Sequence, residues 1–118
     1  MKTIDEIRQV HDVPVVIADQ EGFITFVNAS FQAVFGSESG EILGEPLTAI
    51  IPKNLRDSHH LGFSRFLTTE KPTLLNQPLR LKAVTKEGRE FEAEHFIIAE
   101  QRHGQWLFGA LIRPCGNG

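Results

Sequence analysis

The sequence contains a single cysteine, Cys115, among 118 residues. One cysteine excludes a disulfide within the chain and any metal site built from several thiolates. No apolar run approaches the roughly 18 residues needed to cross a membrane, and residues 1–10 lack the continuous apolar segment of a signal peptide. The net charge of −3 offers no basic surface for nucleic acid or anionic lipid. These absences favour a cytoplasmic protein that binds neither nucleic acid nor membrane.

Motifs of the common catalytic families are also missing from the sequence. The chain has no G-x-S-x-G element, no phosphate-binding loop and no metal-binding constellation. Nor does it contain a serine, histidine and aspartate set with interpretable spacing. We therefore expect that the protein is not an enzyme.

A short flanking helix is expected at the N-terminal end, over residues 1–11. Thr3 and Glu6 have the spacing of a capping box, in which a threonine and a glutamate close the first turn together. The segment carries an apolar stripe at helical spacing, made of Ile4, Ile7 and Val10. This stripe is either part of the core or a contact between two copies of the chain.

The remaining pattern predicts one α+β domain over residues 12–113 and a flexible tail at 114–118. The length suits a single core, and 41% hydrophobic with 23% charged residues is typical of a globular protein. Strands are expected on both sides of a helical middle, at 13–19, 23–28, 79–86, 89–101 and 105–114. His103-Gly104 supplies the last turn. This order predicts a five-stranded antiparallel sheet with helices packed on one face.

Two adjacent histidines, His59 and His60, lie in the longest helical segment, residues 55–68. On a helix that turns about 100° per residue, His59 falls in the apolar stripe with Phe63 and Phe66, whereas His60 falls at its edge and meets water. The two histidines diverge too far to form a zinc pair. An inward histidine is either a hydrogen-bonded core residue or a metal ligand, and helical phase selects His59 for either role.

A third histidine, His95, lies on the apolar face of a predicted strand. Because side chains alternate along a strand, His95 shares its face with Phe91, Ala93, Ile97 and Ala99. The opposite face begins with Glu90, Glu92 and Glu94, which we interpret as a solvated surface. If the long helix lies over the sheet, His59 and His95 face one cavity from opposite sides.

The order of elements resembles a PAS domain, and three segments agree with that family. Residues 13–36 are similar to its opening hairpin, which ends in asparagine and leads into a helix that carries phenylalanine. Residues 51–72 resemble its long helix with the entry to it, and residues 85–100 resemble a charged turn and strand near its end. The resemblance spans roughly residues 12–113 and implies the PAS fold. It does not fix the ligand, because PAS domains host haem, flavin, small acids, fatty acids or nothing.

The segment RDSHHLGFSRFLTT is most similar to the haem-binding oxygen sensors of the FixL type. The resemblance assigns the iron-binding role to His59 and implies that Arg65 lies beside a haem propionate. Leu79 stands near the position of the distal arginine of these sensors, so an arginine switch is missing, although Arg80 is one residue away. His95 stands at a distal position, where it is a candidate hydrogen-bond donor or second iron ligand.

Other residues complete the site that this resemblance implies. Trp106 is a further distal candidate, because some haem PAS domains use a tryptophan on the last strand to hold bound oxygen. A neutral imidazole binds iron through one nitrogen while a carbonyl or water orients the other. The apolar slot that a haem requires is expected to be lined by Phe63, Phe66, Leu74, Leu75, Leu81 and Ile97. The implied cofactor is haem b, with O2, CO, NO or redox state as the signal.

Each of these residues also has a structural interpretation. His95 can be a core histidine that donates to a backbone carbonyl, Trp106 can serve packing, and Arg65 can belong to a solvated face. A flavin photosensor of the LOV type is disfavoured, because it needs a cysteine after the second helix and residues 37–46 contain none. The competing hypothesis is a PAS dimerisation and relay module with a small apolar ligand or no cofactor. In both cases we expect a homodimer and an effector domain, such as a kinase, cyclase or receptor module, in a longer chain.

Overall fold

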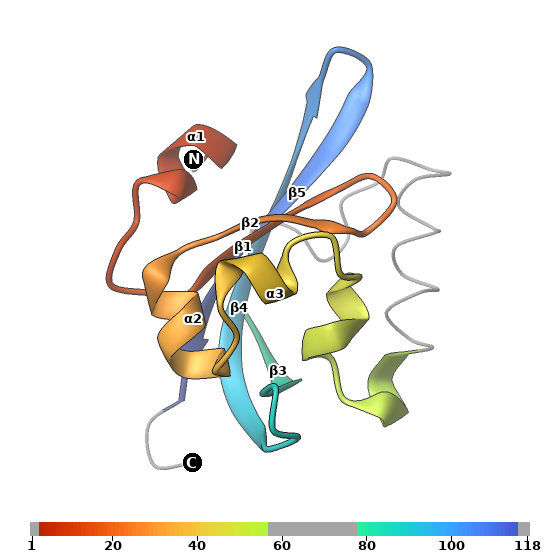
Figure 1. Cartoon of the computed structure of the whole chain (residues 1–118). Helices are drawn as coiled ribbons and strands as arrows, with labels where there is room; N and C mark the ends of the chain where they lie inside the picture. Colours follow the sequence, from red (N-terminus) through yellow and green to blue (C-terminus); the bar gives the residue numbers. More distant parts are fainter. Residues whose placement is uncertain (1–2, 57–77, 116–118) are drawn as a thin grey trace.

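A computed structural model of the chain describes residues 3–56 and 78–115 (Figure 1). Five strands form one antiparallel sheet in the order β2-β1-β5-β4-β3. The elements are α1 (Ile4–Arg8), β1 (Val15–Asp19), β2 (Ile24–Val27), α2 (Ala29–Phe35), α3 (Ser39–Ile42), the 3-10 turns η1 (Leu47–Ile50) and η2 (Lys53–Leu55), β3 (Pro78–Val84), β4 (Glu90–Arg102) and β5 (Gln105–Pro114). The predicted five-stranded antiparallel sheet with its short N-terminal helix is confirmed.

The β1–β2 hairpin and the meander of β3, β4 and β5 are joined along β1 and β5. Ile17 pairs with Gly109 in the centre of this contact, and β2 and β3 form the two edges of the sheet. The last hairpin turns at His103 and Gly104, whose φ angles are 52° and 78°. Two positive φ angles in a two-residue loop match the twist of the flanking strands. β5 runs to Pro114, one residue into the predicted tail, and the Cys115 N–H donates to the Glu92 carbonyl at 2.9 Å.

Two apolar cores lie on opposite faces of the sheet. The inner face, under α2, α3 and η1, buries a cluster of Val16, Ile24, Val27, Phe31, Phe35, Ile42, Ile50, Ala83, Ala93 and Ile112. The outer face, under α1, buries a second cluster of Ile4, Ile7, Val15, Ile17 and Ile98. In Figure 1 α1 lies apart from the group formed by α2 and α3. The apolar stripe of α1 therefore belongs to the core, which was one of its two interpretations.

Local chemistry fixes α1 on the outer face. Thr3 and Glu6 form the predicted capping box, which satisfies free N–H groups of the first turn. The Glu100 carboxylate accepts the Ile4 N–H at 3.3 Å and also pairs with Arg102. Arg102 in turn contacts Asp5 of α1 at 3.1 Å. The helix is thus held by apolar burial on one side and by charged groups of β4 at its N-terminal end.

Asn28 connects the two layers of the molecule. Its Oδ1 accepts the N–H groups of Val15 and Phe31, both at 2.9 Å, and so caps α2 while it anchors β1. Its Nδ2 donates to the carbonyls of Val10 and Val13, both at 2.9 Å. The side chain is buried and every one of its hydrogen-bonding positions is used. Asn28 consequently joins the segment between α1 and β1 to the start of β1 and to the start of α2.

None of the helices that the structure describes is long and apolar enough to span a membrane.

Candidate functional site

The structure describes four of the predicted site residues, namely His95, Trp106, Leu81 and Ile97. The other six lie outside the described residues: His59, Arg65, Phe63, Phe66, Leu74 and Leu75. The metal-ligand role of His59 therefore stays a prediction. Within residues 3–56 and 78–115, no group of three or more His, Cys, Asp or Glu side chains comes close enough to hold a metal ion.

His95 lies on the inner face of the sheet, in the middle of β4. It pairs with Leu79 of β3 on one side and with Ile112 of β5 on the other. Directly paired residues of antiparallel strands point to the same face, and Ile112 is buried in the inner core. His95 thus sits in an apolar row, partly buried, where the strand alternation predicted it.

The two ring nitrogens of His95 differ in their hydrogen bonding. Nδ1 lies 3.1 Å from the carbonyl oxygen of Ala93. Because a carbonyl only accepts, Nδ1 carries the proton of this hydrogen bond. Burial lowers the pKa of His95, and the hydrogen bond to Ala93 opposes the shift only in part. The ring is neutral at pH 7 with its lone pair on Nε2, and Nε2 has no hydrogen-bond partner in the part of the chain that the structure describes.

Apolar residues surround His95 along the inner face. Ile97 pairs with Ala110 on the row toward the hairpin end, and Leu81 pairs with Ala93 on the row in the other direction. Leu81, on the edge strand β3, is 42% exposed, whereas Ala93 is fully buried. The environment combines a single imidazole lone pair with aliphatic side chains, a composition typical of small-molecule sites.

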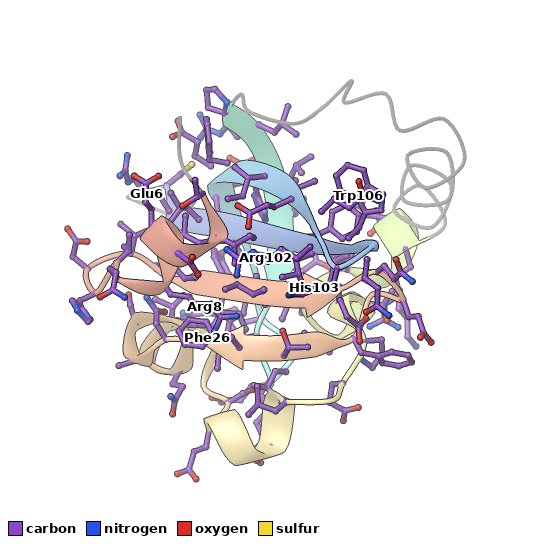
Figure 2. The ribbon with its side chains drawn as sticks, turned by 90° about the horizontal axis from the view of Figure 1, so that it is seen from above. Glu6, Arg8, Phe26, Arg102, His103 and Trp106 are labelled. Atoms are coloured by element: carbon purple, nitrogen blue, oxygen red, sulfur yellow. The ribbon has the colours of Figure 1, made fainter. Side chains whose placement is uncertain are left out.

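Trp106 lies far from His95 on the same face. It pairs with Gln101, six positions beyond His95 along β4, which corresponds to about 20 Å at the usual rise of a strand. Its ring stacks on Phe108 with centroids 6.5 Å apart, and its backbone N–H donates to the Oε1 of Gln20 at 3.2 Å. Figure 2 shows Trp106 on the side of the hairpin away from α1. The two distal candidates therefore cannot both contact one ligand atom.

The outer face carries the charges of this part of the sheet. Arg80 pairs in register with Glu94 and forms an ion pair with Glu92 at 3.0 Å. All three side chains are exposed, as predicted for the glutamate face. Since Leu79, not Arg80, faces inward beside His95, β3 presents no arginine to the inner face at this position.

Two hollows lie at the end of the inner side away from Trp106, where the sequence predicted no site. The smaller one measures about 220 Å³ and lies between α2 and the turn that joins β3 to β4. The larger one measures about 280 Å³ and is also lined by residues of α3 and η1. Both are lined by Phe35 and Thr85, and the larger one is also lined by Ser37. A serine that follows a helix-ending glycine reads as an ordinary loop residue, so the sequence held no signal for this place.

Comparison with known proteins agrees with the fold. A family model described as PAS domain matches residues 12–112. A protein of Azorhizobium caulinodans described as uncharacterized is 32% identical over 104 residues, which are 87% of this chain and 14% of the relative. Sensor protein FixL of Bradyrhizobium diazoefficiens is 23% identical over 106 residues, which are 88% of this chain and 21% of FixL. This chain thus spans between a seventh and about a fifth of the length of these relatives.

Solved structures show the same architecture. The crystal structure of a PAS domain from Desulfitobacterium hafniense superposes with a TM-score of 0.74 at 16% sequence identity. The match covers 94% of this chain and 99% of that domain. With the sheet order β2-β1-β5-β4-β3 and the family match over residues 12–112, these findings show that the chain belongs to the PAS domain family.

Proposed function

We propose that this PAS domain is the sensory input unit of a signalling protein, and that it binds haem between His59 and the inner face of the sheet at His95. Membership of the PAS family supports the sensory role. The similarity to a sensor protein, FixL, supports the choice of a signalling context. The identity of the ligand rests on His59 from the sequence and on the chemistry of His95.

The observation that carries the proposal is the hydrogen bond between the Nδ1 of His95 and the Ala93 carbonyl. A neutral imidazole with its N–H held by a carbonyl and its lone pair directed elsewhere is the form in which histidine binds metals. The Ala93 carbonyl performs this orienting role at 3.1 Å from Nδ1. The burial that lowers the pKa of His95 keeps the ring in this form at neutral pH.

The described residues around His95 suit a flat apolar group. Leu79 and Ile112 flank the ring in register, and Ile97 follows on the same face. Haem supplies an iron that binds diatomic gases or changes its oxidation state, and a histidine ligand with an apolar surround is one of its usual protein settings. Leu81 at the exposed edge then borders the rim of the site.

Between the two roles that the sequence leaves open to His95, the hydrogen bond to Ala93 favours the second. With its proton on Nδ1, the ring has no proton on Nε2 to donate to a bound gas molecule. It does have a lone pair for a metal. We therefore infer that His95 would act as a second iron ligand in addition to His59, which makes a response to redox state or a slow response to gas the preferred signal.

Absorption spectroscopy of the purified chain with added haem tests the proposal. We expect a Soret band at one haem per chain, and His59→Ala should weaken haem binding roughly tenfold or more. His95→Leu should retain haem but convert the oxidised spectrum from low-spin to high-spin, because one ligand is lost. His60→Ala, next to the proposed ligand, and His11→Ala, on an exposed loop, are matched controls that should leave both spectra unchanged.

A protein that stays colourless with added haem, or an unchanged spectrum in His59→Ala, would refute the haem proposal.

The second candidate is a PAS relay module with a small apolar ligand or no cofactor. One observation favours it: the hydrogen bond to Ala93 already gives His95 a structural role without any ligand. Under either proposal we expect a homodimer coupled to an effector domain such as a kinase, cyclase or receptor module. Because Ile4 and Ile7 pack within the chain, such a dimer would use another surface.

A further inference from the structure

The larger hollow lies at the end of the inner side opposite to the hairpin of β4 and β5. It measures about 280 Å³ and opens between α3, η1 and the last residues of β3. Figure 1 shows α3 above the end of β3 that leads into the turn to β4. Val84, which lines it, pairs with Glu90, five positions from the row of His95, or about 17 Å along the strand. The hollow is therefore separate from the proposed haem site.

A buried hydroxyl without a partner lines this hollow. Ser37 is 7% exposed, and its hydroxyl forms no hydrogen bond within the described parts of the chain. Thr85, the neighbouring buried hydroxyl at 8% exposure, accepts the Arg89 N–H at 3.1 Å. Buried polar groups are nearly always paired, because an unpaired one keeps its full desolvation cost. The hollow thus holds an unused hydrogen-bonding group that a bound molecule can satisfy.

The rest of the wall is largely apolar. Its aliphatic and aromatic members are Phe35, Ile42, Ala49, Ile50 and Val84. A cavity of about 150 Å³ holds a benzene molecule, so a hollow of about 280 Å³ accommodates one ring with a short chain. An apolar wall combined with a few convergent polar groups is the usual design of a small-molecule site.

The charges at the opening select the kind of head group. Glu41 and Glu45 line the hollow together with one cation, Lys86, and Lys86 forms an ion pair with Glu41. Glu38 and Glu87 add negative charge near Lys86. Carboxylates therefore outnumber the cation here, so binding of a negatively charged ligand is disfavoured.

We propose that the hollow beside Ser37 binds a small amphiphile with a neutral or cationic head: one ring or branched chain against Phe35 and Ile50, and a hydroxyl or amine on the Ser37 hydroxyl. The site is distinct from the His95 face, so it operates whether or not the domain binds haem. The Lys86–Glu41 pair, which joins the β3–β4 turn to α3, borders the entrance.

The site is tested by titrating small molecules into the full chain while amide chemical shifts are recorded. The probes share a phenyl ring and differ in their polar group. 2-Phenylethanol and 2-phenylethylamine should shift the amide signals of Ser37, Ile50 and Val84 saturably at millimolar concentrations. Phenylacetate should bind at least roughly tenfold more weakly because its carboxylate meets Glu41 and Glu45. Ser37→Ala should weaken binding of the alcohol about three- to tenfold, the worth of one neutral hydrogen bond.

A second variant fills the hollow without touching a polar group. Ala49→Leu should abolish binding of both probes, and Ala49→Val serves the same purpose if the leucine variant does not fold. Ser30→Ala, on α2 away from the hollow, should leave all affinities unchanged. Linear shifts without saturation, tightest binding of phenylacetate, or undiminished binding in Ala49→Leu would each overturn the proposal. Equal affinity of Ser37→Ala for the alcohol would overturn the role of Ser37. Haem binding by the Ala49 variants is measured as well, because it shows whether the substitution affects the hollow alone or also the proposed haem site at His95.

Discussion

The two faces of the sheet differ in how completely they use their polar groups. On the outer face α1 covers the apolar cluster, and the charged groups beside it, Asp5, Glu100 and Arg102, pair with one another or with the Ile4 N–H. On the inner side Nε2 of His95 and the hydroxyl of Ser37 have no partner among the described residues. A closed face with satisfied polar groups serves stability and the placement of α1. Open hydrogen-bonding capacity among apolar side chains marks the side where ligands are to be sought.

The largest expected effect breaks the closed face. A Cβ atom at Gly109 of β5 would collide with the side chains of Ile7 and Ile4 of α1. We expect Gly109→Val to lower the free energy of unfolding by about 2–3 kcal/mol through overpacking, as measured by urea denaturation. Gly40→Ala in α3, where a Cβ has open space, is the matched control and should be neutral or slightly stabilising. A loss below about 0.5 kcal/mol in Gly109→Val would show that α1 is not packed on this face.

A smaller effect sharpens the contrast between paired and unpaired hydroxyls on the inner side. Ser37→Ala removes a buried hydroxyl without a described partner and should raise the free energy of unfolding by about 1 kcal/mol. Thr85→Val keeps the shape of its side chain but leaves the Arg89 N–H without its acceptor, so it should lower the same quantity by about 1 kcal/mol. Thermal unfolding without added ligand measures both. If both substitutions changed the free energy of unfolding in the same direction, the assignment of the Ser37 hydroxyl as unpaired would be contradicted.

The smallest expected effect is the pH dependence that His95 contributes. Because the pKa of His95 is lowered in the folded chain, the unfolded chain binds more protons between the folded pKa and about 6.5, the usual value. Stability from this group is therefore fully present above about pH 6.5 and is lost as the pH falls through the folded pKa. From pH 7 to pH 5 the free energy of unfolding of the wild type should therefore fall relative to that of His95→Leu. A difference independent of pH would place the ring in contact with water.

Much of the fold could be predicted from local patterns. The alternation around Ala93 and Phe91 indicated the face of His95, and that face depends only on the period of a strand. The capping box of Thr3 and Glu6 predicted where α1 begins, because its two hydrogen bonds join residues three apart. Interactions between near neighbours in the chain are the ones that a sequence pattern records directly.

The separation of His95 and Trp106 was also available in principle. A two-residue turn at His103-Gly104 fixes the register of the hairpin, so that Gln101 faces Trp106 and His95 faces Ile112. Strand alternation alone places both side chains on one face, whereas the register also separates them by six positions, or about 20 Å along the strand.

By itself the sequence determined the PAS pattern, the antiparallel sheet and the inward face of His95, because turns, caps and alternation are local. Only the tertiary structure decided that the stripe of α1 packs on the outer face rather than between copies. It also decided that the Nδ1 of His95 is held by the Ala93 carbonyl, and that Ser37, Val84 and Phe35 line one hollow. These features bring together α2, α3 and β3, segments far apart in the chain. Their meeting follows from how whole elements pack, and no spacing along the sequence encodes it.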